Sequence, residues 1–548
     1  MGKYIFVTGG VMSSLGKGIV SSSTANLMIS AGYKVVSIKI DPYINVDAGT
    51  MNPYAHGEVF VTEDGYEADL DMGHYERFTN MLTSRDNNIT TGQVYQSVIR
   101  MEREGAYLGK CVQLVPHITD EIKRRLRDVS QKSGADITIV EVGGTVGDME
   151  SQPFLEAIRQ MKLDEPAGSI MYIHLAHIPF LKHTNELKTK PLQHSVQELR
   201  RIGIQPDMII CRSENGISDD IRRKVSLFTS VPYDMVISDP DASTIYEVPL
   251  VLENQGMVGK ISKMLQLGIK EADTKQWKGF VDRINNARAD LNIYMIGKYT
   301  DDRDSYMSIT EAVHHSAAAV GARAIIHWVE STNLEDGSIS VNSILDDNAG
   351  YVILPGFGKR GTEGKIAALK ELRMRNVPVL GICFGMQLMA IEIARNVVGI
   401  EGAGSTELDP NTGHPVVDML EEQKKVKMMG GTMRLGSRRA TLVDNTLAHK
   451  IYGSNVVYER HRHRYEINPE YVEALGKAGF IVSGYSDEGF PDFMELKDNL
   501  FYIGTQGHPE FKSRPLSPAP LFRAFMEAVA ERNMLKKEDI SRTNAVSK

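Results

Sequence analysis

Cysteine is scarce in this sequence. Its 548 residues include only Cys111, Cys211 and Cys383. Three cysteines so far apart cannot build a disulfide framework, and none belongs to the closely spaced pairs that zinc sites use. Such usage is typical of a reducing compartment, and we expect a cytoplasmic location.

Long apolar runs and a positive net charge are also missing. No run approaches the length of a membrane span, and the first residues lack the charged region and apolar stretch of a secretion signal. The chain has 62 Lys and Arg against 70 Asp and Glu, a net charge of -8, so no global positive field would attract nucleic acid or anionic lipid. We therefore expect small-molecule substrates, no nucleic acid, no membrane partner and only local binding of phosphate.

Strand and helix patterns alternate through the chain. Hydrophobic residues make up 42% of it, which is typical of a globular protein, and its length exceeds what one hydrophobic core usually holds. A first βαβ unit is predicted from an apolar run at 3–8, a glycine-rich turn, a helical pattern at 18–31 and a strand at 35–40. Further buried strands are predicted at 137–142, 169–175, 208–212, 292–296, 351–355 and 377–382. The predicted fold class is α/β, with a parallel sheet covered by helices in the N-terminal half.

A polar, charged stretch divides the chain. Residues 269–291 include Trp277 among many charged side chains, and a fresh strand begins directly after them. We therefore expect one domain at 1–268, a linker at 269–291 and a second domain at 292–530. Residues 531–548 are polar without apolar periodicity, and we expect them to form a mobile tail.

A strand that runs into Cys383 suggests a nucleophile. The apolar residues 377–382 lead to Cys383, and a helix is predicted to start at Phe384. A cysteine on such a sharp turn points its sulfur into a cleft at a helix N-terminus, where the dipole favours the thiolate. A lone cysteine is more often a buried apolar residue, so the interpretation depends on the motifs that accompany it.

Two further motifs supply what a thiol nucleophile needs. His508 and Glu510 flank a proline, which favours an extended backbone in which residues two apart share a face, so we expect Glu510 to orient His508 as a base. The loop after the strand at 351–355 begins with small residues, including Gly356, and can lend N–H groups to an oxyanion. Together the motifs favour a catalytic role for Cys383.

These motifs resemble the class I glutamine amidotransferase domain, with Cys383, His508 and Glu510 as its triad. Pro355 occupies the first of two positions at which that family more often has glycine. We therefore expect the N–H groups of Gly356 and Phe384 to be the oxyanion donors.

The same resemblance implies which residues hold glutamine. Glu407 and Arg464 are expected to bind its charged ends. The other expected glutamine-binding residues are Gly356, Phe384, Gly385, Met386 and Gln387. His461 and His463, in the segment RHRHRYE, are expected to lie at the surface or in a loop.

A glycine-rich loop with Lys17 lies between the first strand and the first helix, where phosphate-binding loops are found. It is not a strict Walker A motif. The spacing from Gly10 to Gly16-Lys17 is one residue longer, and Gly18 replaces the serine or threonine that normally contacts magnesium.

Without that hydroxyl, acidic residues elsewhere must bind the magnesium. We expect Asp71 and Glu141, because magnesium prefers hard oxygen ligands and Glu141 ends a buried strand at the binding edge of the predicted sheet. The other acids nearby, Asp64, Glu67 and Asp69, are more simply interpreted as a solvated loop.

A glutaminase joined to an ATP site predicts an amidoligase. The glutaminase releases ammonia, and ATP can convert a poor carbonyl leaving group into phosphate. Ammonia can then form a C–N bond at that carbon. Chemistry alone does not name the acceptor.

Long motifs across the chain are similar to those of the CTP synthase family. They are YIFVTGG with SSLGKG, KIDPYINVDAGTMNPYAHGEVFVTEDG, LDMGHYERF, EVGGTVGDMES, KTKPLQHSV and ERHRHRYE. The resemblance runs from Tyr4 to about Phe525. It implies an N-terminal P-loop-like parallel-sheet amidoligase domain that aminates UTP to CTP with ATP, and a C-terminal class I glutamine amidotransferase α/β domain that supplies ammonia.

Carried over residue by residue, the resemblance assigns the nucleotide sites. The expected ATP-binding residues are Leu15, Gly16, Lys17, Gly18, Ile19 and Asp71. The expected UTP- and CTP-binding residues are Ser14, Asp148, Met149, Glu150, Lys188, Thr189, Lys190, Gln193 and Lys224. Lys188 and Lys190 precede Pro191 in what we interpret as an extended segment that presents alternate cations to a triphosphate. A KxK sequence alone would be interpreted as a solvated strand edge.

The resemblance also implies a mechanism and its regulation. ATP phosphorylates the uracil 4-oxygen, ammonia displaces the phosphate, and glutamine is hydrolysed through a thioester on Cys383. An internal passage is expected to carry the ammonia. Mg²⁺ is the expected cofactor, GTP the activator, CTP the inhibitor and a homotetramer the assembly.

Two other functions fit parts of the sequence. A cobyric-acid-synthase-like amidotransferase shares the domain order, but KTKPLQHSV and GTVGDMES speak against it. A nucleotide switch with an inert glutaminase domain is a different class of protein. The intact set of Cys383, His508 and Glu510 speaks against that alternative.

Overall fold

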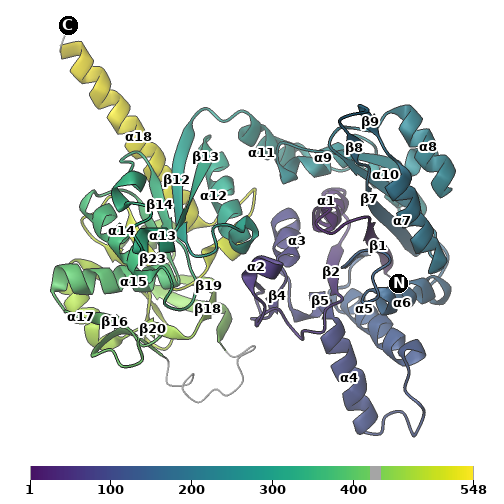
Figure 1. Ribbon diagram of the computed structural model, residues 1–548, viewed down its shortest axis with the longest axis horizontal. Coiled ribbons are helices and arrows are strands. Elements are labelled where there is room, and N and C mark those ends of the chain that lie inside the picture. The colour runs from purple at the N-terminus through teal and green to yellow at the C-terminus, as the bar shows by residue number, and fades with distance from the viewer. Residues whose placement is uncertain (1, 269, 420–432, 547–548) are drawn as a thin grey trace. The chain divides into compact units, whose positions relative to one another are not determined.

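The computed structural model describes residues 2–268, 270–419 and 433–546, which form two compact units (Figure 1). The first unit comprises Met1–Ala48 and Asp71–Val281, and the second Gly49–Leu70 and Asp282–Lys548. The division near residue 281 lies within the stretch predicted as a linker. The sequence did not predict that Gly49–Leu70 belongs with the second unit.

The first unit is built on a parallel sheet, as predicted. Its seven strands lie in the order β11 (Val236–Pro240), β10 (Met208–Ser213), β7 (Ile170–His177), β1 (Lys3–Gly10), β6 (Ile137–Val142), β2 (Val35–Asp41) and β5 (Asn88–Thr90). The loops that follow β1, β6 and β7 meet at the carboxyl edge of the sheet, since these strands are neighbours with the same direction.

Helices cover both faces of this sheet because side chains alternate along each strand. Ile5 and Val7 of β1 pack into one core, and Tyr4 and Phe6 pack into the other. The first core includes α1 (Lys17–Ser30), α8 (Asp219–Thr229), α9 (Val248–Glu253) and α10 (Met257–Met264). The second includes α4 (Thr91–Arg103), α5 (Thr119–Ser133) and α6 (Gln152–Asp164).

The predicted linker contains a helix, α11 (Lys275–Asn285). Its residues Trp277 and Phe280 are buried, and their rings pack against Tyr246 of the first unit. Trp277 Nε1 also donates a hydrogen bond of 2.7 Å to the Tyr246 carbonyl oxygen. The start of this stretch is therefore an integral part of the first unit's core.

The second unit is built on a nine-stranded mixed sheet. The strand order is β13 (Arg323–Glu330), β12 (Asp290–Gly297), β14 (Gly350–Ile353), β15 (Val379–Ile382), β23 (Tyr502–Thr505), β22 (Pro491–Leu496), β21 (Phe480–Ser486), β18 (Arg434–Leu442) and β19 (Val456–His463). The first five strands are parallel and the last four are antiparallel to their neighbours. A smaller sheet contains β16 (Ala403–Ser405), β17 (His414–Met419) and β20 (Tyr465–Ile467).

Helices also pack on both faces of the large sheet. One core includes α12 (Met307–Ala319) and α18 (Pro520–Val546), and the other includes α14 (Thr362–Met374), α15 (Phe384–Ile393) and α17 (Pro469–Lys477). Helix α18 continues through Val546, so the backbone of the segment predicted as a tail is helical up to that residue.

The early segment Gly49–Leu70 folds onto the second unit. It contains α2 (Pro53–His56) and the short hairpin of β3 (Phe60–Val61) and β4 (Glu67–Ala68). Glu58 accepts hydrogen bonds from the backbone and hydroxyl of Ser308, and Phe60 packs edge-on against Phe511. None of the helices in the described ranges combines the length and apolar character that crossing a membrane requires.

Candidate active site

Cys383 lies on a sharp turn between β15 and α15, as the sequence predicted. Its φ of 51° and ψ of -105° are a conformation that a non-glycine residue adopts only under strain. Glycines on both sides make the tight turn possible. A Cβ on Gly385 would lie 2.2 Å from the Ile353 carbonyl oxygen, and one on Gly381 would lie 2.4 Å from the Met389 sulfur.

His508 and Glu510 form the pair predicted from the sequence. His508 Nδ1 lies 2.7 Å from Glu510 Oε1, and both side chains are buried. The predicted reason was wrong, because Pro509 starts a 3₁₀ turn (Pro509–Lys512) instead of holding an extended backbone. The turn brings the two side chains together.

The electrostatics of this pair favour a charged imidazolium. Burial lowers the pKa of His508, but the Glu510 carboxylate and Cys383 outweigh it and raise the pKa to about 10. His508 Nε2 is buried and makes no hydrogen bond among the described residues. It is therefore available for proton exchange with the Cys383 thiol.

The triad lines a cavity of about 390 Å³ in the second unit. Gly356 and Phe357 line it too, and two buried lysines hold their loop. Lys298 Nζ donates a hydrogen bond of 2.8 Å to the Phe357 carbonyl oxygen, and Lys365 Nζ donates one of 2.7 Å to Leu354. Burial lowers the pKa of Lys298 to about 8. The residues of the early segment that line the cavity are Gly49, Thr50, Met51, Glu58 and Val59.

Glu407 and Arg464 lie near each other at this site. Arg464 lines the cavity, and Glu407 Oε1 accepts a hydrogen bond of 2.6 Å from the Gly358 N–H. Burial raises the pKa of Glu407, and this effect exceeds the opposing effects of that N–H, Lys298 and Arg464. The structure thus brings two opposite charges close together at the cavity, an arrangement that suits the two charged ends of an amino acid.

Other predicted glutamine-binding side chains do not reach the cavity. Met386 is part of the apolar core, packed where a Cβ on Gly504 would collide with it. Gln387 turns to the backbone of Tyr465 and to Gln506, with Nε2 donating at 2.9 and 3.1 Å. Neither Met386 nor Gln387 is among the described residues that line the cavity.

Sequence reasoning missed Gln506 and misplaced two histidines. Gln506 is fully buried and its Nε2 lies 3.4 Å from Cys383 Sγ; its place two residues before His508 was the signal. His461 and His463, expected at the surface or in a loop, are only 1% and 2% exposed in β19. Alternation along RHRHR would have predicted one buried face.

The glycine-rich loop of the first unit leads into α1. Gly16 adopts a left-handed conformation before the helix, and Lys17 Nζ donates a hydrogen bond of 2.8 Å to the Gly144 carbonyl oxygen. The structure explains why position 18 is glycine. A Cβ there would lie 2.1 Å from Asp71 Oδ1, so the carboxylate occupies the space that a serine or threonine would need.

Asp71 and Glu141 converge on Lys39, a buried lysine that sequence reasoning did not identify. Lys39 Nζ contacts Asp71 Oδ2 and lies 3.0 Å from Glu141 Oε1. Burial raises the pKa of both carboxyls; for Asp71 the charge of Lys39 more than offsets this and the net shift is downward, while for Glu141 the net shift is upward. Tyr75 donates a further hydrogen bond of 2.5 Å to Glu141.

The two convergent carboxylates suit a hard cation such as magnesium. In the described ranges, no group of three or more His, Cys, Asp and Glu side chains forms a metal site. A cation held by Asp71 and Glu141 would therefore need further oxygen ligands from water or from a phosphate. Of the acids interpreted as solvated, Asp64 is exposed, but Glu67 is buried and paired with Arg462 at 2.8 Å, which corrects that interpretation.

The predicted UTP-binding residues follow the carboxyl ends of adjacent strands. Asp148, Met149 and Glu150 come after β6, and Ser14 after β1. Asp148 Oδ2 accepts a hydrogen bond of 2.7 Å from Thr145 N–H, and Met149 is 79% exposed. The remaining positions, Lys188, Thr189, Lys190, Gln193 and Lys224, lie after β7 and on α7 (Lys190–Arg201) and α8.

The predicted extended segment before Pro191 is a helix start. Thr189 has helical angles and Lys190 is the first residue of α7. Proline is favoured in a first helical turn because its missing N–H is not needed there. Gln193 Nε2 donates a hydrogen bond of 3.0 Å to Thr189 Oγ1, and Lys188 pairs with Glu186 at 2.7 Å.

A cysteine elbow with a His–Glu pair in one α/β unit, and a glycine-rich loop on a parallel sheet in the other, define a glutamine amidotransferase joined to an ATP-dependent ligase. The family model described as CTP synthase N-terminus matches residues 3–267, and that of glutamine amidotransferase class-I matches 303–528. The chain belongs to the CTP synthase family and is a glutamine-dependent ligase.

Individual relatives match almost end to end. A CTP synthase of Sulfurisphaera tokodaii is 53% identical over 530 residues, covering 97% of this chain and 100% of that protein. A CTP synthase of Methanocaldococcus jannaschii is 53% identical over 531 residues, covering 96% and 98%. The solved glutaminase domain of Trypanosoma brucei CTPS with bound acivicin shares 36% identity and a TM-score of 0.41, covering 44% of this chain and 94% of that one.

Proposed function

We propose that this protein aminates UTP to CTP, using ATP and the ammonia released from glutamine, in pyrimidine nucleotide biosynthesis. The observation that carries the proposal is the Cys383 elbow beside His508 and Glu510, in a chain that matches CTP synthases over 97% of its length. It operates in the cytoplasm as a homotetramer, with GTP as activator and CTP as inhibitor, as the family resemblance implies.

Glutamine hydrolysis takes place in the second unit. The Cys383 thiolate attacks the amide carbonyl, and the backbone N–H groups of Gly356 and Phe384 stabilise the oxyanion. The amide C–N bond breaks, ammonia leaves with a proton from His508, and a glutamyl thioester remains. Water, deprotonated by His508, then releases glutamate and restores the thiolate. The raised pKa of His508 supports its role as the proton donor.

Amination takes place in the first unit. The uracil 4-oxygen attacks the γ-phosphorus of ATP, ADP leaves, and the 4-phosphorylated UTP accepts ammonia at C4 with loss of phosphate. Lys17 offsets charge on the transferred phosphoryl group. Asp71 and Glu141 are the residues that would hold Mg²⁺, which would neutralise phosphate charge, and Lys39 fixes their orientation. An internal passage delivers the ammonia, since ammonia in bulk water is protonated and lost.

The nucleotide assignments are part of the proposal. ATP is bound by the loop at Leu15–Ile19 together with Asp71, and UTP and CTP share the positions around Asp148–Glu150 and Lys188–Gln193. Their common place after neighbouring strand ends supports this assignment.

The test compares Cys383→Ala with the parent protein. CTP is followed by absorbance with UTP, ATP and magnesium, and with either saturating glutamine or an ammonium salt. The variant is expected to lose glutamine-dependent synthesis and keep ammonia-dependent synthesis, because ammonia bypasses the thioester. An equal loss of CTP synthesis with glutamine and with ammonium salt would contradict the proposal that glutamine hydrolysis and amination occur at two separable sites. Omission of UTP, ATP or magnesium in turn identifies the substrates.

A further inference from the structure

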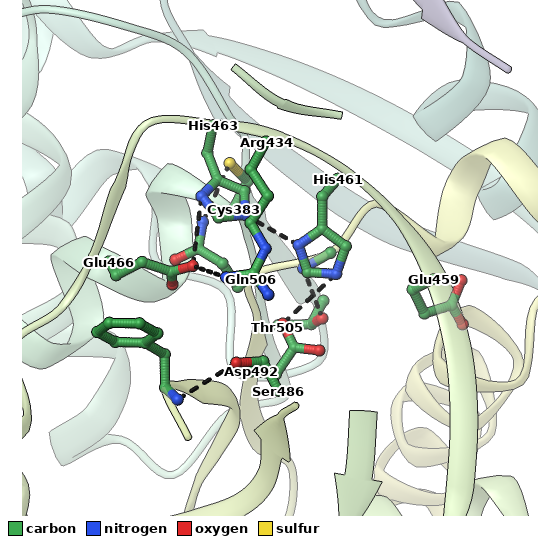
Figure 2. Close-up of polar contacts among 12 residues, drawn as sticks. Cys383, Arg434, Glu459, His461, His463, Glu466, Ser486, Asp492, Thr505 and Gln506 are labelled. Carbon is green, nitrogen blue, oxygen red and sulfur yellow. Dashed lines mark hydrogen bonds and ion pairs between the residues drawn. The ribbon is translucent and has the colours of Figure 1, made fainter. Parts of the chain in front are cut away.

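Strand β19 alternates two buried histidines with two arginines. His461 and His463 point to the inside of the second unit, whereas Arg460 and Arg462 point to the early segment, where Arg460 pairs with Glu63 at 3.0 Å. Buried polar ring atoms usually have hydrogen-bond partners, yet His461 Nε2 is buried and makes no hydrogen bond among the described residues. Figure 2 shows the two histidines in contact with each other, with Glu459, Glu466 and Asp492 around them.

The hydrogen bonds of this pair fix where its protons are. His463 Nδ1 lies 3.2 Å from the Tyr465 carbonyl oxygen, which can only accept, so Nδ1 carries a proton. In the neutral ring Nε2 then accepts, from His461 Nδ1 at 2.9 Å. His461 Nε2 is therefore left with a lone pair.

That lone pair faces a carboxylate. His461 Nε2 lies 3.5 Å from Asp492 Oδ1, and Asp492 is 2% exposed. Two acceptors buried face to face repel each other unless a proton lies between them. The chain Tyr465–His463–His461–Asp492 thus needs one proton more than two neutral imidazoles and an ionised carboxylate provide, whichever of its atoms carries it.

The same side chains support the catalytic segment from behind. The carbonyl oxygen of Asp492 accepts a hydrogen bond of 2.8 Å from Gln506 N–H, and Gln506 Nε2 lies 3.4 Å from Cys383 Sγ. A Cβ on Gly507 would lie 2.9 Å from Glu459 Cβ and 3.4 Å from His461 Nε2, so both side chains pack against the residue before His508.

We propose that His461 and Asp492 share one buried proton, and that this proton positions the segment from Gln506 to His508 for glutamine hydrolysis. Both are positioning residues, since they act through that segment and do not touch the reacting atoms. The inference rests on the proposed glutaminase function. When the proton is lost, the pair repels, and the segment from Gln506 to His508 moves away from its working position beside Cys383.

The groups around His461 and Asp492 determine the pH at which the pair loses its proton. Burial raises the pKa of Asp492 to about 7, with Arg434 opposing and Glu459 and Glu488 adding to the rise. Burial and nearby cations keep the pKa of His461 well below its ordinary value. Among the described residues, the charged and titratable groups that face the pair are Arg434, Arg438, Tyr452, Glu459, His463, Glu466, Glu488 and His508.

The test uses Asp492→Asn and Asp492→Leu in the full-length protein. The asparagine amide keeps an N–H directed at His461 Nε2 at every pH, so glutamate release by Asp492→Asn should stay within about threefold of the parent near pH 6.5. Its alkaline loss of activity should shift upward by at least about one pH unit, because it has no proton to lose. Asp492→Leu leaves the lone pair buried without a donor, and its kcat for glutamine should fall roughly tenfold or more at all pH values. The KM for glutamine should change little, since Glu407 and Arg464 are untouched.

Glu459→Gln is the matched control. Glu459 is as deeply buried and its pKa is also raised by burial to about 7, but it bonds Tyr452 and lies outside the histidine chain. Because the Glu459 charge adds to the rise of the Asp492 pKa, its loss should leave the alkaline limb unchanged or move it to lower pH, opposite to the shift expected for Asp492→Asn. An equal upward shift of the alkaline limb in Glu459→Gln would mean that the loss of any buried negative charge produces the effect. An unshifted alkaline limb in Asp492→Asn would overturn the proposal that His461 and Asp492 share a proton.

Two further measurements keep the result unambiguous. His461→Gln removes the ring that shares the proton, so its alkaline limb should also differ from the parent, and an unchanged limb would count against the proposal even if Asp492→Asn fails to fold. Ammonia-dependent CTP formation should be unchanged in every folded variant. If Cys383→Ala retained glutamine hydrolysis, the proposed function itself would fail, which is a separate outcome.

Discussion

Gly18 offers a sharp test of the ATP site, because the sequence departs there from the usual phosphate-loop motif. Gly18→Ser restores the hydroxyl that such loops normally carry. In this fold the new Cβ would lie 2.1 Å from Asp71 Oδ1 and 2.9 Å from Asp71 Cγ. The carboxylate cannot yield easily, since its side chain is only 19% exposed and contacts Lys39. A restored motif should therefore damage the enzyme.

The expected cost follows from the size of the overlap. Relieving it moves the Asp71 carboxylate by about 1 Å, and overpacking of this kind costs about 1–3 kcal/mol. The melting transition of the first unit should fall by roughly 2–12 °C, on the scale of about 2–4 °C per kcal/mol for a unit of this size. If Asp71 holds magnesium as proposed, a displacement of about 1 Å should lower the rate by roughly 100-fold. Glutamine hydrolysis in the second unit should persist.

Calorimetry and CTP formation from ammonium salt measure the two effects. Gly259→Ala in α10 is the control, because a Cβ there meets nothing within 4 Å and alanine favours a helix interior. It should be neutral or slightly stabilising. A Gly18→Ser protein with the stability and rate of the parent would refute the argument that Asp71 occupies the hydroxyl's place.

Three further outcomes are expected. Lys17→Ala should abolish CTP formation from glutamine and from ammonia while leaving the melting transitions in place, and near-normal synthesis would remove Lys17 from the mechanism. Lys190→Ala should raise the KM for UTP and weaken CTP inhibition together, with the KM for ATP as the control; a change for ATP alone would contradict the assignment. Glu510→Gln removes the main charge that raises the pKa of His508 to about 10, so the pKa should fall, the alkaline limit of glutaminase activity should move to lower pH, and kcat should drop by roughly 10²–10⁴. An unmoved limit in Glu510→Gln would show that the carboxylate does not govern His508.

Local patterns in the sequence were sufficient for the parallel sheet and for the turn at Cys383. Apolar periodicity identifies strands, and a strand that ends in cysteine and glycine has few ways to continue. The extended segment expected at Lys188–Lys190 was wrong although a local signal existed, because Pro191 in a first turn favours a helix start. The proline therefore predicts a helix start at this position, whereas the alternation of the two lysines favours an extended strand.

Other features depend on partners far away in the chain. In the sequence, Lys39 is an ordinary polar residue within a predicted strand. Its contacts with Asp71 and Glu141 form only when the chain folds. The burial of His461 depends in the same way on Asp492, which comes from another strand. Polar residues are buried when such partners exist, and a single sequence does not reveal them.

The placement of Gly49–Leu70 also constrains the order in which the protein can mature. Glu63 pairs with Arg460, which is 397 positions later in the chain, and the same segment lines the cavity that contains Cys383. During synthesis from the N-terminus, this hairpin must therefore wait for β19 to emerge before it can dock. The glutaminase cavity is therefore completed only when nearly the whole polypeptide exists, well after the ATP-dependent half has been synthesised.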